Sequence, residues 1–504
     1  MRISQARGYA IFLPGSASKS LVATAKSCDN ATMNANPAII QGGMGAGVSS
    51  WRLARAVSAL GQLGVVSGTA LDQIFARRLQ DGDPGGHMWR GLLRFPFREM
   101  GERVWKAYYR AGGKREDEPY VAVPMHAKER VRELEELCIV ANFVEVGLAR
   151  EGHEWPVGIN YLEKIHIPHL PSIYGALLAG VGYVLMGAGV PLRIPGVLDL
   201  LAEHRAAAYP LHVTGVPSGD DRTTFDPREF MERDVMPLTR PKFLAIVSSN
   251  TLAVTMQKKA NGRVDGFVIE GQSAGGHNAP PRGKLQLDAA GEASYGERDV
   301  VDLAKIRELG LPFWLAGGYG SREKFREALG AGAAGIQVGT AFAYCAESGL
   351  REDYKRLLLE KVASGTARVR SDVRASPTSF PFKIAELEGT TSEADVYRSR
   401  ARICDLGYLR EAYRTADGEI GYRCPAEPVS LYVAKGGKRE NTVGKRCLCN
   451  SLLATIGHPQ VRKGKRVESG LVTSGFDLAG IGRFFPAGSS QYSAADVIAH
   501  LLGA

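Results

Sequence analysis

The sequence predicts an α/β protein built on a (β/α)8 TIM barrel. Eight short apolar runs recur along the first two thirds of the chain, and each ends in, or is directly followed by, Gly, Asn or Ser. Near-continuous apolar runs are typical of parallel strands that are covered on both faces. The runs span residues 37–41, 62–66, 156–160, 182–186, 242–247, 264–270, 312–316 and 333–338. An open, doubly wound sheet is the main alternative, because eight strands predicted from one sequence carry error.

Helical patterns fit between these runs. The clearest patterns are at residues 49–60, 249–260, 300–309 and 321–330. Ser321 stands where the last of these helices begins, and its hydroxyl is suited to accept a hydrogen bond from the first turn as an N-cap. Strands that alternate with helices in this way favour the barrel.

The rest of the chain divides into a leader, two insertions and a C-terminal region. Residues 1–36 are short of acidic residues and lack an apolar segment of secretory length, so a disordered leader is expected, with an organelle-type leader as the alternative. The barrel spans residues 37–345, with insertions at 70–155, mostly helical, and at 204–240. Residues 346–504 are expected to form a helical and loop-rich, cysteine-containing cap. In a barrel, insertions and caps gather at the C-terminal face, where substrate pockets form.

Composition narrows the class of protein. The formal net charge of +10 is modest for 504 residues, and no basic patch interleaved with aromatic residues points to nucleic acid. No apolar stretch approaches the length of a membrane span. Seven cysteines, an odd number, argue for a reducing compartment and against a disulfide framework, so a cytoplasmic protein is expected, of unknown oligomeric state.

Two glycine-rich segments follow the last two predicted strands. Gly317-Gly318 comes directly before a helix, and Gly339-Thr340 occupies the same place after the next strand. Bare backbone at the start of a helix offers N–H donors to a phosphate, and late loops of barrels often bind one. Taken alone, such a glycine segment favours a tight turn, whereas two of them on consecutive strands favour a phosphate site.

A third segment runs from Ile269 to His277 at the end of the sixth predicted strand. Gly275 and Gly276 allow the backbone to approach a flat ring closely. His277 stands where a general base with a near-neutral pKa would be useful, although a histidine merely hydrogen-bonded in a loop is the alternative. No GxGxxG motif stands in a strand–turn–helix context, so a Rossmann domain is not expected.

Five short motifs, taken in order, resemble the nitronate monooxygenase (2-nitropropane dioxygenase) family. They are IQGGMG at 40–45, GIN at 158–160, GQSAGGH at 271–277, AGG at 316–318 and QVGT at 337–340. The related FMN-dependent enoyl reductases of polyketide and polyunsaturated fatty-acid pathways share this order. The resemblance spans residues 37–345, while the segment 151–162 and the long C-terminal region look closer to the larger, polyketide-associated branch.

The resemblance implies a non-covalent FMN at the C-terminal mouth of the barrel. Gln41, Gly42 and Met44 would border the isoalloxazine ring, beside Gly275 and Gly276, and Asn160 would bind the polar edge of the ring. The phosphate would be held by Gly317, Gly318, Gly339 and Thr340, with Gln337 nearby. The protein contributes orientation and electrostatics to the chemistry of the cofactor.

The resemblance also implies that His277 is the catalytic base, taking the α-proton of a nitroalkane. One position departs from the family pattern. Family members commonly have Glu directly before Ala-Gly-Gly-His, and this chain has Ser273. Glu270, three residues earlier, is a candidate substitute for the missing carboxylate, and an exposed structural role is equally compatible.

Three functions follow as hypotheses. The first is an FMN-dependent oxidoreductase that oxidises nitronates or nitroalkanes with oxygen. The second is an FMN- and NAD(P)H-dependent reductase of enoyl thioesters borne by an acyl carrier protein, which the large insertions and Ser273 favour. The third is a flavin-binding module without turnover. The expected partner is therefore a small molecule or a carrier-bound acyl substrate, and neither nucleic acid nor a membrane.

Four cysteines in the C-terminal region form the remaining candidate site. Cys404, Cys424, Cys447 and Cys449 lie among glycine-rich loops, and four thiolates can bind Zn²⁺ or an iron–sulfur cluster. Their spacing is not that of a zinc finger, and buried free thiols are the alternative. Cys28 and Cys138 stand apart from this group.

Overall fold

The computed structural model describes residues 36–216 and 221–503, so the expected leader lies outside the described residues apart from Asn36. Eight parallel strands form one sheet in the order β1-β11-β10-β9-β8-β4-β3-β2. The strands are β1 (Ile39–Gln41), β2 (Gly64–Ser67), β3 (Val157–Leu162), β4 (Tyr183–Gly187), β8 (Lys242–Val247), β9 (Gly266–Glu270), β10 (Phe313–Ala316) and β11 (Gly335–Val338).

The two edges of this sheet meet. The backbone N–H of Gln41 donates to the carbonyl of Leu63 at 2.9 Å, and the N–H of Leu63 donates to the carbonyl of Ile39 at 3.0 Å. These bonds join β1 to the residue that precedes β2 and close the ring. The predicted (β/α)8 barrel is therefore confirmed, and the open sheet is excluded.

Alternation along the strands explains why both faces are apolar. Successive side chains of a strand point to opposite faces. One buried cluster fills the barrel interior, and it contains Ile40, Val65, Leu185, Leu244, Val268 and Trp314. Their chain neighbours, such as Ile39, Val66, Val184, Phe243 and Phe267, belong to the second cluster, which packs against the helices.

The helices between the strands match the sequence patterns. They are α2 (Trp51–Ala59), α7 (His169–Leu178), α8 (Ile194–Ala202), α9 (Asn250–Lys259), α10 (Leu303–Arg307), α11 (Arg322–Gly330) and α12 (Thr340–Ala343). The hydroxyl of Ser321 accepts from the N–H of Lys324 at 3.2 Å, which confirms the predicted N-cap. Helix α10 begins later than predicted because the carboxylate of Asp302 caps it, accepting from the N–H of Ala304.

The first insertion supplies four helices, and the second supplies short strands. The helices are α3 (Leu71–Gln80), α4 (His87–Leu92), α5 (Arg98–Tyr108) and α6 (Arg132–Ala149). Helix α6 packs against α7, α2 and α3, so it occupies the place of the barrel helix between β2 and β3. In the second insertion β5 (Ala207–Pro210) pairs with β7 (Arg222–Phe225), followed by η1 (Pro227–Glu229). The intervening β6 (Val213–Thr214) pairs instead with a strand of the C-terminal region.

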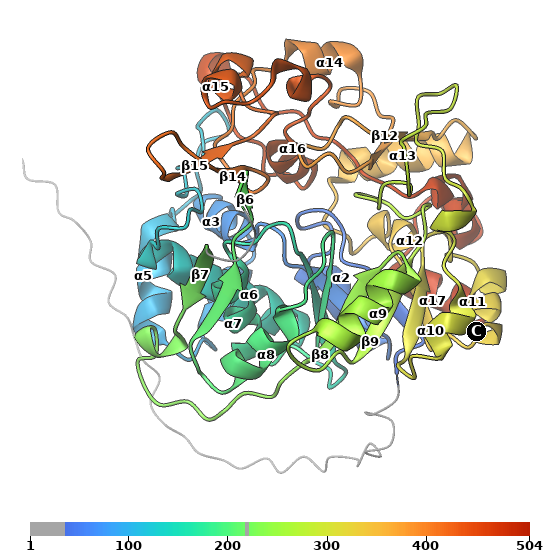
Figure 1. The fold of residues 1–504 in the computed structure, drawn as a ribbon, viewed down its shortest axis with the longest axis horizontal. Helices are drawn as coiled ribbons and strands as arrows, with labels where there is room; N and C mark the ends of the chain where they lie inside the picture. The colour runs from blue at the N-terminus through green and yellow to red at the C-terminus, as the bar shows by residue number, and fades with distance from the viewer. Residues whose placement is uncertain (1–35, 217–220, 504) are drawn as a thin grey trace, which may run out of the picture. The chain divides into compact units, whose positions relative to one another are not determined.

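The C-terminal region gathers on one side of the barrel, in orange to red in Figure 1. A short turn, η2 (Glu297–Asp299), lies in the loop after β9. The elements of the C-terminal region are α13 (Glu352–Ala363), β12 (Val369–Asp372), β13 (Phe382–Ala385), α14 (Ala394–Ser399), β14 (Glu411–Arg414), β15 (Ile420–Arg423), α15 (Val429–Ala434), η3 (Arg439–Thr442), α16 (Leu448–Thr455), η4 (Lys463–Lys465), η5 (Phe476–Phe484) and α17 (Ala494–Leu502). Helix α17 returns to the barrel and packs against α2 and α11. Among the described residues, no helix combines the length and apolarity needed to cross a membrane.

Candidate active site

The carboxyl ends of the barrel strands open into a cavity of about 220 Å³. Residues that follow β1, β3, β9, β10 and β11 form its floor and walls. The C-terminal region forms its roof, with Tyr408, Leu409, Cys449, Val472, Thr473 and Ser474. Ligand sites of α/β barrels lie at this face, because the loops after the strands converge there.

Nearly all of the predicted site residues line this one cavity. They are Gly42, Met44, Asn160, Gly275, Gly276, His277, Gly317, Gly318, Gln337, Gly339 and Thr340. They come from five different strand ends, which the parallel order of the barrel brings to one edge.

Gln41 is the exception, since it does not line the cavity. Its side chain is fully buried. The Oε1 atom accepts from the N–H of Val65 at 3.0 Å, and Nε2 donates to the hydroxyl of Ser49 at 2.8 Å. In the structure Gln41 thus joins β1 to β2 and to the loop after β1, and its contact with a flavin stays a prediction.

The glycines of the floor leave no room for side chains. Gly317 and Gly318 have φ values of +85° and +77°, in the left-handed region that favours glycine. A Cβ on Gly317 would lie 3.0 Å from the backbone N of Ala274, and one on Gly275 would lie 2.9 Å from the backbone N of Gly475. Bare backbone thus borders the cavity on two sides.

This bare backbone carries free hydrogen-bond donors. Within residues 36–216 and 221–503, the N–H groups of Gly318, Gly339 and Thr340 have no protein acceptor. The buried Oε1 of Gln337 and the buried Oγ of Ser474 also lack a partner in this part of the chain. Buried polar groups are normally hydrogen-bonded, so unpaired donors and acceptors around one cavity indicate a polar ligand that completes them.

His277 lies in the loop after β9 and faces both the cavity and the C-terminal region. Its Nε2 atom is 2.7 Å from the Oγ of Ser376, and its ring packs edge-on against Phe382 at a centroid distance of 4.8 Å. Burial, and secondarily the charge of Lys164, hold the pKa of His277 well below its usual value. The imidazole is therefore neutral at physiological pH and can accept a proton.

The loop that carries His277 is held in place by β13. The N–H of Lys383 donates to the carbonyl of Gly276 at 3.0 Å. The ammonium group of the same lysine, which is fully buried, donates to the carbonyl of Gln272 and to Oδ1 of Asn278 at 2.6 Å. Lys383 belongs to the C-terminal region, and no sequence motif singles it out.

Glu270, the last residue of β9, also lines the cavity. Burial raises the pKa of Glu270 to about 7, although the charges of Lys383 and Lys164 act in the opposite direction. Burial lowers the pKa of Lys164 to about 7 and that of Lys383 to about 8. The carboxyl group is partly buried at the cavity wall, where the charges of Lys383 and Lys164 act on it, so a fully exposed role does not describe it. Lys164 follows β3, and this position after a barrel strand is the one signal that could have identified it.

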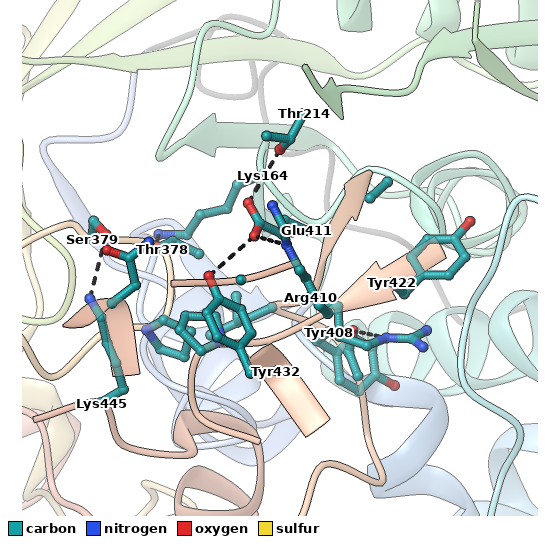
Figure 2. Close-up of a pocket in the computed structure, with 18 of the residues that line it drawn as sticks. Lys164, Thr214, Thr378, Ser379, Tyr408, Arg410, Glu411, Tyr422, Tyr432 and Lys445 are labelled. Carbon is teal, nitrogen blue, oxygen red and sulfur yellow. Dashed lines mark hydrogen bonds and ion pairs between the residues drawn. The ribbon is translucent and has the colours of Figure 1, made fainter. Parts of the chain in front are cut away.

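A second cavity of about 910 Å³ lies beside the first and shares Ile165, Tyr408 and Leu409 with it. We call it the basic cavity, because cations outnumber anions in its lining. The lining cations are Lys164, Arg374, Arg410, Arg423, Lys438 and Lys445, and the lining carboxylates are Glu411 and Glu440. Figure 2 shows Lys164 and Thr378 in contact on one side and Glu411 bound to Thr214 and Tyr432 on the other.

The four cysteines of the C-terminal region do come together. Cys404, Cys424, Cys447 and Cys449 surround a small apolar space of about 10 Å³. A hydrogen bond with Cys424 lowers the pKa of the Cys404 thiol. In the described residues, however, no three of these sulfurs lie within 4.8 Å of one another.

A different group has the spacing of metal ligands. It consists of Asp72 of α3, His126 of the loop before α6, and Cys138 of α6. The Nε2 atom of His126 is 2.9 Å from Oδ2 of Asp72 and 4.0 Å from Sγ of Cys138. Tyr408 donates to the other oxygen of Asp72. No sequence motif groups these residues, because they lie far apart in the chain.

Part of the barrel is similar in sequence to known proteins. Residues 229–399 match the family model described as nitronate monooxygenase. A nitronate monooxygenase of Paraburkholderia phytofirmans is 31% identical over 233 residues, which cover 46% of this chain and 57% of that protein. A nitronate monooxygenase of Pseudomonas aeruginosa is 32% identical over 176 residues, covering 35% of this chain and 44% of that protein.

The chain thus spans about half the length of the curated relatives it matches. The solved structure of a nitroalkane oxidase from Streptomyces ansochromogenes aligns with a TM-score of 0.46 and 16% identity, covering 94% of this chain and 97% of that one. The matched segments include β8, β9 and β10 and the loop that ends in His277. Over part of its barrel, the chain is therefore similar to nitronate monooxygenases.

Proposed function

We propose that the protein is an FMN-dependent oxidoreductase of nitronate monooxygenase type, which oxidises nitronates or nitroalkanes with oxygen. One observation carries the proposal: a neutral histidine faces the same cavity as a set of unpaired backbone donors and bare glycines. FMN supplies the redox chemistry when bound, because it accepts electrons from the substrate and passes them to oxygen.

The residues present fit this cofactor. The unpaired N–H groups of Gly318, Gly339 and Thr340 would hold the phosphate, as backbone donors at helix starts do. The unpaired Oε1 of Gln337 and the side chain of Asn160 would meet the polar edge of the ring. The remaining predicted positions, Gly42, Met44, Gly275 and Gly276, would border the flat faces of the ring, where only small or flexible groups allow close approach.

His277 would take the α-proton of a neutral nitroalkane. A base whose pKa is held low removes protons only from carbon acids that ionise readily, and nitroalkanes are such acids. A nitronate is already deprotonated and needs no base. The two substrate forms therefore separate the part of His277 from the part of the cofactor.

A second candidate function is reduction of an enoyl thioester with NAD(P)H, the substrate being borne by an acyl carrier protein. The basic cavity favours it, since about 910 Å³ lined by six cations suits an extended, anionic substrate better than a small nitroalkane. Ser273 in place of the family's usual carboxylate is compatible with this chemistry. A flavin-binding module without turnover is the third outcome.

The test is to purify the protein, record its absorption spectrum, and add NADPH or a nitronate without oxygen. Bleaching of the flavin by the nitronate supports the oxidase, and bleaching by NADPH supports the reductase. A bound flavin that neither compound bleaches supports the module, and failure to bind FMN overturns all three. In the His277→Ala variant, FMN should stay bound while turnover of neutral nitroalkane is lost.

We further propose that the four clustered thiols hold a Zn²⁺ ion or an iron–sulfur cluster. Support comes from their shared apolar space and from the ligand chemistry of thiolates. The sulfurs would have to move closer together on binding. Asp72, His126 and Cys138 are the competing place for a metal, and variants of each group distinguish the two.

A further inference from the structure

We propose that a chain of hydrogen bonds, from His277 through Ser376 and Thr378 to Lys164, carries the proton that His277 takes from substrate into the basic cavity. The inference rests on the proposed function, in which His277 is the base. Its members other than His277 belong to no motif of the sequence. Ser376 and Thr378 come from the loop between β12 and β13, and Lys164 from the loop after β3.

The hydrogen bonds from His277 to Lys164 form a continuous path. The Nε2 atom of His277 is 2.7 Å from the Oγ of Ser376. That oxygen is 2.9 Å from the Oγ1 of Thr378, to which the Nζ of Lys164 donates at 3.2 Å. All three distances are within hydrogen-bonding range. Figure 2 shows the contact between Lys164 and Thr378 at the wall of the basic cavity.

Hydrogen bonds that involve the backbone of Ser376 and Thr378 hold the two hydroxyl groups in place. The N–H of Thr378 donates to the Oγ of Ser376 at 3.2 Å, and Nζ of Lys445 donates to the Ser376 carbonyl at 2.7 Å. Ser376 is fully buried, whereas Thr378 and Lys164 line the basic cavity. The hydrogen-bonded path therefore runs from the cavity that His277 lines, through the buried hydroxyl of Ser376, to the basic cavity.

Each member can both receive and release a proton. A hydroxyl donates one hydrogen and accepts through its lone pairs, and an imidazole uses its two nitrogens separately. Among the described residues, Nδ1 of His277 has no protein partner, so it is available to the substrate while Nε2 contacts Ser376. A proton gained at Nδ1 can thus leave from Nε2.

The transfer balances without a change of oxidation state. The N–H bond at Nε2 of the imidazolium breaks, and Ser376 gains that hydrogen as its own passes to Thr378. Thr378 passes its hydrogen to the amine of Lys164. The net result is that imidazolium and amine become imidazole and ammonium.

The charges around the two ends favour this direction. The pKa of Lys164 lies at about 7 through burial, so both the amine and the ammonium are present near neutral pH, and the pKa of His277 lies lower. Glu270 and Glu163 face Lys164 and stabilise its ammonium form. Phe380 does the same, since Nζ lies 4.4 Å from the centre of its ring. Lys383, which faces Glu270, is the remaining nearby cation.

The competing explanation is that the hydroxyl groups of Ser376 and Thr378 have a purely structural role. The protonation state of the substrate distinguishes this explanation from the relay. Proton transfer matters for a neutral nitroalkane and not for the preformed nitronate. Thr378→Val removes the hydroxyl group and keeps the shape of the side chain, whereas Thr378→Ser keeps the hydroxyl group. Ser379→Ala is the control, because it removes a neighbouring hydroxyl group that is not part of the relay. Lys164→Met removes the final acceptor.

In the holoenzyme, Thr378→Val and Lys164→Met should each lower kcat for the neutral nitroalkane by about tenfold or more, with nitronate turnover within about twofold of wild type. Thr378→Ser and Ser379→Ala should retain both activities. Imidazole added to the Lys164→Met enzyme should restore turnover in part, since the basic cavity admits it. Equal losses with both substrates, or no loss in Thr378→Val, would overturn the relay alone. A wild-type enzyme inactive on both substrates would overturn the proposed function, and the relay with it.

Discussion

The imidazole of His277 and the hydroxyl of Ser376 lie 2.7 Å apart, although 99 positions separate them in the chain. The first belongs to the loop after β9, and the second to the C-terminal region. The candidate base is therefore positioned by a segment outside the barrel. Lys383 has the same effect on the loop itself, since it binds Gln272 and Asn278 on either side of the glycines.

Replacing Gly317 or Gly318 by Ala should weaken FMN binding. Both residues have a positive φ, which costs an alanine about 1 to 2 kcal/mol, and the added Cβ would press on Ser273 and Ala274. An increase of about tenfold in the Kd for FMN is expected, measured by flavin fluorescence quenching. Gly330→Ala at the end of α11 is the matched control, because a Cβ there meets nothing within 4 Å. Equal affinity in all three variants would contradict the phosphate site.

Gln41→Leu should destabilise the barrel. The change leaves the buried N–H of Val65 without its acceptor and removes one of the hydrogen bonds of the Ser49 hydroxyl, which keeps its bonds to Met44 and Gly42. The free energy of unfolding should fall by about 2 to 4 kcal/mol, measured by urea titration followed by tryptophan fluorescence. Gln257→Leu on the exposed face of α9 should change it by less than about 0.5 kcal/mol. If Gln41→Leu instead keeps wild-type stability and loses FMN, the residue contacts the flavin after all.

Glu270→Gln should alter how stability depends on pH. The pKa of Glu270 is raised to about 7 from a usual 4.5, so between these values the folded state retains a proton that the unfolded state has lost. The wild-type protein therefore loses stability as pH rises through this window, by about 1.4 kcal/mol for each pKa unit of the shift. The glutamine variant lacks this loss. Unfolding at about pH 5 and about pH 7 measures it, and a difference between the two proteins that does not change with pH would refute the prediction.

Metal analysis of the purified protein should find about one zinc, or one iron–sulfur cluster, per chain. Cys424→Ser and Cys447→Ser should lose it, whereas Cys138→Ser should keep it. Loss in Cys138→Ser alone would assign the metal to Asp72, His126 and Cys138. If the wild-type protein, prepared without oxygen, contains no metal, both proposed metal sites are wrong.

The sequence by itself determined the barrel and most of the cavity at its C-terminal face. Both depend on short-range patterns: apolar runs specify parallel strands, and the residue after each run must lie at the same edge. Gly317, Gly339 and His277 could be placed together for this reason alone. Gln41 could not, because the side to which the last residue of a three-residue strand points depends on how β1 meets β2.

Only the tertiary structure decided what surrounds the base. Ser376, Thr378 and Lys383 come from the C-terminal region, where glycine-rich loops and short elements carry little periodicity to read. The same is true of Asp72, His126 and Cys138, which gather from separate segments. Contacts between residues so distant in the chain depend on how whole helices and strands pack, and a local sequence pattern does not encode that packing.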